Sequence, residues 1–223
     1  MIPLSDIDRD REGRRFPAVT AGIIGMNIVM FLLEAANGHA FILRWSLIPA
    51  EIAAGHGYIT ILSAMFMHAG VLHILGNMVY LAAFGPELEE VMGRGRYLVF
   101  YLLGGLAATM AQFAMNPTSV VPNLGASGAI AAVMGAFLVT FPHDRIRTLL
   151  VIGFYVTISF VPAVILVGFW FLIQLFSEVG ALTQRHGGAG VAYMAHIGGL
   201  IFGVVTARLF EPPQRRILYG VDR

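Results

Sequence analysis

Asn123-Leu124-Gly125-Ala126-Ser127-Gly128-Ala129 opens one of the long apolar runs of this chain. A serine with a glycine two residues before it and another directly after it is unusual at the start of such a helix. Glycine weakens helix ends, and a hydroxyl group gains little in hydrocarbon unless another group uses it. Small residues also cluster in membrane helices simply to let backbones approach one another. Taken alone, the stretch favours close packing, so a chemical role for Ser127 depends on partners elsewhere in the chain.

The composition excludes a soluble globule. Of the 223 residues, 57% are hydrophobic and 12% are charged, and a soluble domain carries about twice that charge. The chain has no cysteine, which excludes disulfides, thiolate metal sites and a cysteine nucleophile. No basic patch is interleaved with aromatic residues, so we expect no nucleic-acid partner. The polar first sixteen residues contain no cleavable signal peptide, and the first hydrophobic helix should direct insertion.

Apolar runs of about 17 to 25 residues predict membrane-spanning helices. We expect an all-α, polytopic membrane protein with six transmembrane helices, of which the fifth is long enough to tilt. A short segment, 1–17, precedes the six-helix domain, 18–210, and a tail, 211–223, follows it. The six expected spans are Ala18–Ala36, Gly70–Gly85, Tyr97–Met115, Gly125–Phe141, Thr148–Phe176 and Gly190–Phe210.

The distribution of arginine predicts the orientation, since the chain has no lysine. With both termini in the cytoplasm, twelve of the fourteen arginines lie on the cytoplasmic side, and only Arg44 and Arg185 lie outside. This is the bias that the positive-inside rule describes. We expect a multi-pass protein of a prokaryotic inner membrane. The loop 37–69 should lie partly in the interface, and the glycine-rich segment 180–190 should form a mobile loop before the last span.

Polar side chains inside the spans converge on one depth. His73 and Asn77 lie on the second span, Ser127 on the fourth and His196 on the sixth. Counted from the cytoplasmic end of each span, they lie roughly 15 to 24 Å above the inner boundary at 1.5 Å per residue. Polar groups that serve only local structure would rarely fall in a single layer. Four side chains from three helices therefore predict one site.

Two rows of small residues predict that the fourth and sixth spans pack closely. Ala195, Gly199 and Gly203 repeat at a spacing of four residues, as do Ser127, Ala131 and Gly135. Such rows let helix backbones approach, and a short serine side chain reaches a histidine only when the backbones are close. We assign close packing to Gly125, Gly128, Gly199 and Gly203.

Nucleophilic acyl transfer follows from a serine beside a histidine. A base within about 2.6 to 3.2 Å activates the hydroxyl, and His196 is the candidate base for Ser127. His73, Asn77 and the backbone N–H of Ser127 are the candidate donors to the oxyanion. All thirteen Asp and Glu residues lie outside the spans or at their ends. We therefore predict a Ser–His dyad and a slow enzyme, because removing the carboxylate of a triad lowers turnover by about 10⁴. We expect no metal and no cofactor.

The pattern resembles the rhomboid family of intramembrane serine proteases over all six spans. The matching motifs are His68-x-x-x-x-His73-x-x-x-Asn77, Gly125-Ala126-Ser127-Gly128 and Ala195-His196-x-x-Gly199-x-x-x-Gly203, with the 84–97 junction between the second and third spans. The resemblance implies Ser127 as nucleophile, His196 as general base and an oxyanion hole at His73, Asn77 and the Ser127 amide. It also implies a cavity open to the outside, lateral entry beside the fifth helix, and single-pass membrane proteins as substrates.

Two positions depart from the family. Many members carry a tyrosine one turn after the serine, where its ring stacks on the catalytic histidine, and here that residue is Ala131. An aromatic such as Phe169, Trp170 or Tyr193 would have to hold His196 instead. The Trp-Arg pair of the first loop is reversed here as Arg44-Trp45, so we carry no role over to it.

The sequence leaves three alternative hypotheses for the function. A proteolytically inactive relative that binds membrane clients typically lacks the serine or the histidine, and both are present. A metal or haem protein would use His68, His73 and His196, but His68 and His73 are five residues apart and turn about 140° from each other on a helix. A transporter would show discontinuous helices in paired halves, which are not evident.

Overall fold

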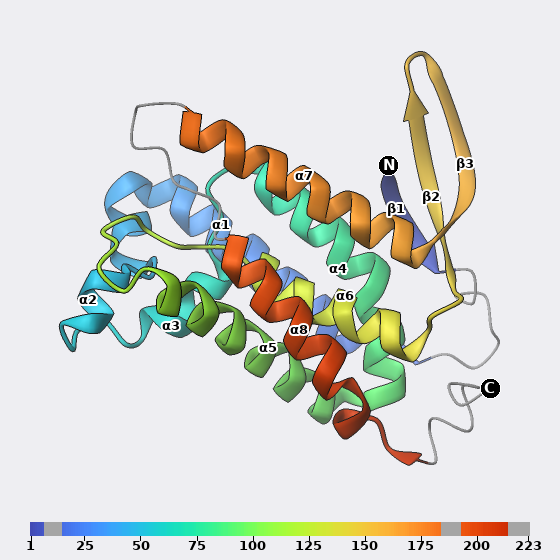
Figure 1. Ribbon diagram of the computed structural model, residues 1–223, viewed down its shortest axis with the longest axis horizontal. Helices are drawn as coiled ribbons and strands as arrows, with labels where there is room; N and C mark the ends of the chain where they lie inside the picture. Colours follow the sequence, from blue (N-terminus) through green and yellow to red (C-terminus); the bar gives the residue numbers. More distant parts are fainter. Residues whose placement is uncertain (7–14, 184–192, 214–223) are drawn as a thin grey trace.

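The computed structural model describes residues 1–6, 15–183 and 193–213, and it forms a bundle of helices with a small sheet at one end (Figure 1). Three short helical turns connect the first long helix to the second. The long helices are α1 (Ala18–Trp45), α4 (Val71–Met92), α5 (Arg94–Met115), α6 (Ser127–Thr140), α7 (Ala163–Thr183) and α8 (Tyr193–Phe210). The short turns are α2 (Pro49–Ala53), α3 (Thr60–Ser63) and η2 (Ala64–Phe66), and the strands are β1 (Ile2–Asp6), β2 (Arg145–Ile152) and β3 (Tyr155–Pro162).

Helix α6 is the centre of the bundle. Twelve of its 14 residues are buried, and it packs against α4, α5 and α8. A helix that is apolar all round is stable only when it is enclosed on every side. Its 14 residues extend about 21 Å, which is less than the roughly 30 Å of a bilayer's hydrocarbon core. By its length alone, α6 is therefore too short to cross that layer.

The approach of α6 and α8 depends on residues without side chains. A Cβ on Gly199 would collide with the backbone oxygen of Gly128, and a Cβ on Gly203 would collide with that of Ala132. From the other helix, a Cβ on Gly135 would meet the carbonyl oxygen of Leu200. The two backbones are thus in direct contact, as the spacing of the small residues predicts.

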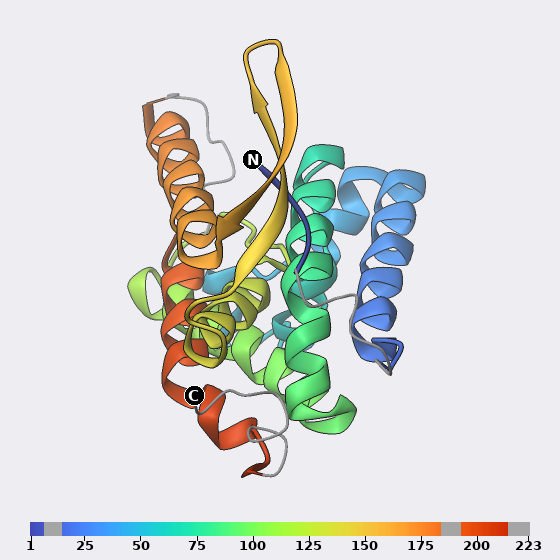
Figure 2. The ribbon, with the colours of Figure 1, turned by 90° about the vertical axis from the view of Figure 1, so that its right-hand side faces the viewer.

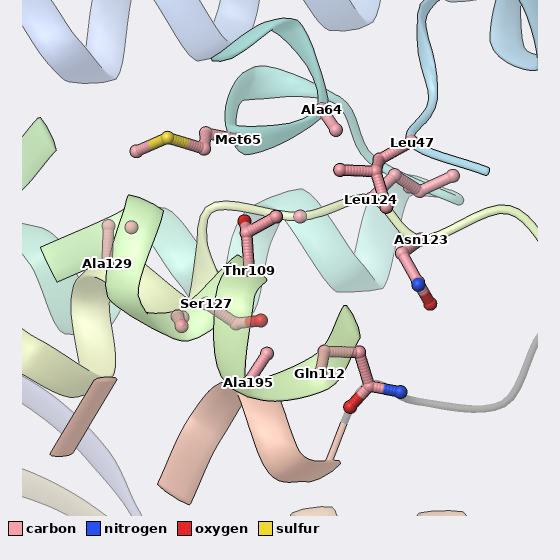
Figure 3. A pocket seen from close by; sticks show the side chains of 14 residues that line it. Leu47, Ala64, Met65, Thr109, Gln112, Asn123, Leu124, Ser127, Ala129 and Ala195 are labelled. Carbon is pink, nitrogen blue, oxygen red and sulfur yellow. The ribbon is translucent and has the colours of Figure 1, made fainter. Parts of the chain in front are cut away.

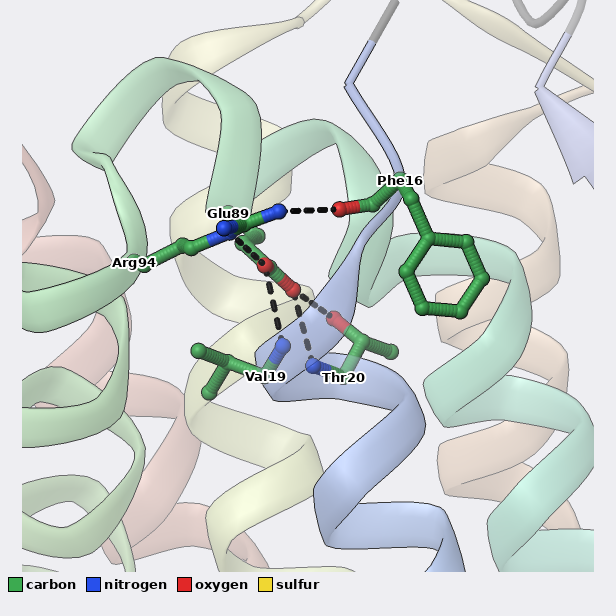
Figure 4. Close-up of polar contacts among 5 residues, drawn as sticks. All are labelled: Phe16, Val19, Thr20, Glu89 and Arg94. Carbon is green, nitrogen blue, oxygen red and sulfur yellow. Dashed lines mark hydrogen bonds and ion pairs between the residues drawn. The ribbon is translucent and has the colours of Figure 1, made fainter.

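A buried carboxylate docks the start of α1 onto the junction of α4 and α5 (Figure 4). Glu89 accepts hydrogen bonds from the backbone N–H groups of Val19 at 3.0 Å and Thr20 at 2.8 Å, and from the Thr20 hydroxyl at 2.8 Å. Arg94 lies 3.8 Å from Glu89 and donates to the backbone oxygen of Phe16 at 3.0 Å. Since α1 has no capping side chain of its own at Pro17, Glu89 of α4 satisfies its first free N–H groups.

The prediction of a fifth span over Thr148–Phe176 is wrong in its first half, and the prediction of an all-α fold overlooked a sheet. Strands β2 and β3 form an antiparallel hairpin with a two-residue loop, where Gly153 has a φ of 59°. Strand β1 pairs with the other edge of β2, and α7 begins only at Ala163. Hydropathy does not distinguish an apolar hairpin from an apolar helix; the β-branched residues and the glycine between them are the signal for strands.

Within the described ranges, four helices are long and apolar enough to cross a membrane: α1, α4, α5 and α8. Helix α6 and the part of α7 up to Ile173 are apolar but shorter. The number of six spans therefore remains a prediction. Helix α1 continues beyond its predicted end at Ala36 to Trp45, with a break at Gly38, whose φ is 70°. The predicted mobile loop lies mostly in 184–192, outside the described residues, and 180–183 belong to α7.

Candidate active site

The side chains of Ser127 and His196 are in hydrogen-bond contact. His196 Nε2 lies 2.7 Å from Ser127 Oγ, and the exposed fractions of His196 and Ser127 are 1% and 9%. Ser127 is the first residue of α6 and His196 lies in the first turn of α8. The glycine contacts between the two helices bring the short serine side chain within reach of the imidazole. The Nδ1 atom of His196 has no hydrogen-bond partner among the described residues.

An aromatic ring from α7 packs against the imidazole. The ring centroids of Trp170 and His196 are 4.9 Å apart at an interplanar angle of 64°, and the ring centroid of Tyr80 of α4 lies 6.1 Å from that of Trp170. Of the three aromatics that the sequence offered in place of a ring at Ala131, Trp170 is thus the one in contact with His196. Trp170 is 4% exposed, so three helices hold this layer together.

His73 faces the serine across the backbone of Gly125. A Cβ on Gly125 would lie 3.2 Å from His73 Nε2 and 3.4 Å from Ser127 Oγ. Gly125 has a φ of 135°, a conformation that L residues rarely adopt, so this small space is kept open by both sterics and backbone geometry. His73 Nδ1 accepts a hydrogen bond from the backbone N–H of Ala69 at 3.3 Å. The neutral ring therefore carries its proton on Nε2, toward the space beside Ser127.

Asn77 is connected to His73 through the ring of His68. Its Nδ2 atom donates to His68 Nε2 at 3.0 Å, and the His68 and His73 rings are 5.1 Å apart. Burial, together with the nearby His73, lowers the pKa of His68 to about 3. His68 is thus a neutral acceptor at physiological pH. An amide nitrogen has two hydrogens, so one N–H of Asn77 remains beyond the bond to His68.

Glu34 is a buried residue that sequence reasoning missed. The sequence predicts Glu34 at the end of the first span, but its side chain is only 3% exposed in α1. Its two oxygens accept the backbone N–H of His68 at 3.0 and 3.2 Å. Acidic residues in membrane segments usually have a specific partner. The acidic Glu34 near the end of an otherwise apolar run could therefore have indicated a buried carboxylate. Glu34 fixes the backbone that carries His68.

A small cavity adjoins Ser127 on the side of α5 (Figure 3). It has a volume of about 40 Å³, and Thr109, Gln112 and Asn123 contribute its polar lining. The Oε1 atom of Gln112 is buried without a partner among the described residues. A water molecule needs roughly 10 to 15 Å³ of such volume and two or more polar partners. The cavity therefore has the size and chemistry to supply water next to Ser127.

In the described ranges, no group of three or more His, Asp or Glu side chains has an arrangement that could hold a metal ion. His68 is hydrogen-bonded to Asn77, and His73 is hydrogen-bonded to the backbone N–H of Ala69. The chemistry of this layer is that of a hydroxyl, imidazoles and an amide.

Comparison with known protein families gives a match to the Rhomboid domain over residues 55–212, which includes both contacting side chains. The chain belongs to the rhomboid family. This rhomboid is a multi-pass membrane protein whose described residues are mostly helical. It is 29% identical over 202 residues to rhomboid protease GluP of Bacillus subtilis, which covers 89% of this chain and 36% of GluP.

Two further relatives are mitochondrial proteins. Rhomboid protein 1 of Saccharomyces cerevisiae is 27% identical over 212 residues, covering 90% of this rhomboid and 57% of the yeast protein. Presenilin-associated rhomboid-like protein A of Danio rerio is 26% identical over 196 residues, covering 86% of this chain and 47% of the fish protein. This rhomboid thus spans between about a third and three fifths of the length of these three relatives.

Proposed function

We propose that this rhomboid is an intramembrane serine endopeptidase in which Ser127 is the nucleophile and His196 is the general base. The observation that carries the proposal is the 2.7 Å contact between His196 Nε2 and Ser127 Oγ. A serine hydroxyl is a weak nucleophile until an adjacent base accepts its proton. The name of GluP as a rhomboid protease supports the same chemistry for a relative over most of this chain.

The reaction proceeds in two steps. His196 Nε2 takes the hydroxyl proton while Ser127 Oγ attacks the scissile carbonyl carbon, and the same proton then passes to the leaving amine as the C–N bond breaks. A water molecule next attacks the acyl-serine and gives one proton to His196, which passes it to Ser127 Oγ as the acyl C–O bond breaks and the carboxylic acid product leaves. The cavity lined by Thr109 and Gln112 is the proposed source of that water.

Three donors stabilise the oxyanion in this scheme. The backbone N–H of Ser127 is free of intrahelical bonds because it lies in the first turn of α6. The Nε2–H of His73 points into the space in front of Gly125. The second N–H of Asn77 is the third donor. A donor lost from such a site lowers kcat by about 10² to 10³.

The substrates in this proposal are single-pass transmembrane proteins. An intact helix satisfies its own carbonyl groups, so the scissile segment has to unwind before the serine reaches it. We propose that it enters from the bilayer beside α7, and that 18–210 is the protease domain between a short leading segment and a tail. The arginine distribution supports cytoplasmic termini, and we propose a prokaryotic inner membrane as the location.

Cleavage by the purified protein tests the proposal. Wild-type protein in liposomes, incubated with a panel of single-span substrates, should yield products cut within or near the transmembrane segment. The Ser127→Ala protein, inserted to the same level, should yield none. Equal cleavage by Ser127→Ala, or no cleavage of any panel member by the wild type, would refute it.

A further inference from the structure

Among the described residues, no helix covers the apolar face of the sheet. In the antiparallel register, Leu149 pairs with Ile158 and, on its other side, with Ile2. Directly opposed residues project to the same face, so the pair Val151 and Val156 extends this face toward the hairpin loop. Across the three strands, the apolar side chains on this face are Ile2, Leu149, Val151, Val156, Ile158 and Phe160.

Most of this apolar face is open. The exposed fractions of Val151, Val156 and Ile158 are 53%, 63% and 49%, and the loop residue Phe154 is fully exposed. Both ribbon views show the hairpin extending beyond the helices (Figures 1 and 2). Water-soluble proteins rarely expose contiguous apolar patches of this kind, and a two-stranded hairpin without packing is marginal in water.

The opposite face of the same sheet behaves differently near its base. Ile146, Thr148 and Val161 point to that side and are buried, with exposed fractions of 0%, 0% and 9%. Ile146 and Val161 belong to the main hydrophobic core. The base of the sheet is therefore fixed to the bundle, while the apolar face and the loop are held clear of it.

Continuity with the membrane-facing surface indicates what covers the apolar face. Strand β3 runs directly into α7, whose first turn exposes Val164 and Ile165 at 57% and 51%. The hairpin contains no acidic residue, and its only charges are Arg145 and Arg147 at the base. Phospholipid matches this pattern, because cations at the base complement headgroup phosphates and aromatic residues favour the interface.

The open edges of the sheet limit how deep it lies. Among the described strands, β3 pairs only with β2, so its outer edge carries backbone N–H and C=O groups without partners in the sheet. Such an edge is not stable in hydrocarbon, but water and headgroups can satisfy it at the interface. The hairpin therefore rests in the interface and does not span the membrane.

We propose that the apolar face of the β1–β2–β3 sheet is a lipid-binding surface that inserts into the interface of the phospholipid leaflet at the arginine-rich end of the bundle. Phe154 of the hairpin loop forms its leading edge, and Arg145 and Arg147 lie at headgroup level. This surface acts independently of the proposed catalysis.

Single-cysteine labelling tests the proposal cleanly, because the chain has no cysteine of its own. We would attach a nitroxide to Phe154→Cys and, as the matched control, to Arg96→Cys, an exposed position at the same end of the bundle. Each protein is placed at one copy per phospholipid nanodisc without substrate, which removes other proteins as occupants. A water-soluble relaxation agent should reach the Phe154 label several-fold less than the Arg96 label, and oxygen dissolved in lipid should reach it more.

Equal access of the water-soluble agent to both labels would overturn the proposal. Protection of Phe154 that appears only when several copies share one vesicle would also overturn it, because the face would then bind a second copy. A Val156→Cys label on the face, with the same protection as Phe154, separates insertion of the whole face from contact by the loop alone.

Discussion

Helix α6 and the hairpin of β2 and β3 follow each other in the chain and are both strongly apolar, yet they have opposite surroundings. Val133 and Phe137 of α6 are completely buried, whereas Val156 and Phe160 of β3 are exposed by 63% and 50%. Hydropathy indicates only that a segment is apolar, and it does not indicate whether other parts of the protein cover that segment. Small residues decide whether protein covers it: Gly128 and Gly135 let α6 meet its neighbours, while the hairpin presents large side chains outward.

The largest expected effect comes from widening the contact between α6 and α8. Gly199→Val should abolish cleavage, because its side chain would collide with the backbone of Gly128 and separate Ser127 from His196. Overpacking of this kind usually costs about 1 to 3 kcal/mol in stability, so some protein should still insert. The measurement is the cleavage rate of a single-span substrate, normalised to inserted protein.

Gly76→Val is the matched control for Gly199→Val. It lies on α4, and a Cβ there would meet no atom within 4 Å. Its rate should stay near that of the wild type. A normal cleavage rate for Gly199→Val would contradict the inference that the glycine contacts between α6 and α8 hold Ser127 and His196 together.

Loss of the proposed oxyanion donors should have the next largest effect. His73→Ala and Asn77→Ala should each lower kcat by about 10² to 10³, with His73→Ala the more severe because its ring borders the space beside Ser127. Steady-state kinetics separate the two parameters. A change in KM alone would mean that these residues bind substrate uniformly and do not act in the transition state.

The contact from α7 should have a smaller effect. Trp170→Ala should reduce kcat about tenfold, because the imidazole of His196 would lose the ring that packs on it. This is less than the roughly 10²-fold loss that a 1 Å misplacement of a catalytic group can cause. Trp170→Phe should retain most activity, and Phe169→Ala, one residue away, serves as the control. If Trp170→Ala raised KM and left kcat unchanged, Trp170 would contribute to substrate entry and not to the position of His196.

The smallest effect is expected in the hairpin. Val156→Ser should change the free energy of unfolding in detergent by less than about 0.5 kcal/mol, as surface substitutions do, whereas Val133→Ser in α6 should lower it by about 1 to 3 kcal/mol. Denaturant titration of both variants measures the difference. Equal losses would show that protein covers the hairpin face as tightly as it covers α6.

The sequence predicted the convergence of polar groups better than the path of the chain. The sequence predicts one depth for Ser127, His196 and His73, because depth in the membrane follows from the fixed rise per residue of a helix. The position of Trp170 was open among three aromatics, because ring contacts depend on the rotation and tilt of α7. The burial of Glu34 could not be predicted, because hydropathy does not reveal whether a nearby loop folds back over the end of a span.

The error in the fifth span has a physical origin. Leu149, Val151, Ile158 and Phe160 would suit a membrane helix as well as a strand, because both place apolar side chains against lipid or protein. Gly153 between two β-branched runs is the local sign of a hairpin turn. Gly153 therefore indicates a hairpin only when turn geometry is considered together with hydropathy.

The most direct test of the central claim is the site at which a fluorophosphonate reacts with the membrane-inserted protein. We predict a single adduct on Ser127, identified by mass spectrometry of its peptide, that is absent from Ser127→Ala and strongly reduced in His196→Ala. An adduct on another residue, or labelling of Ser127 at an undiminished rate without His196, would contradict the claim that the imidazole activates this hydroxyl.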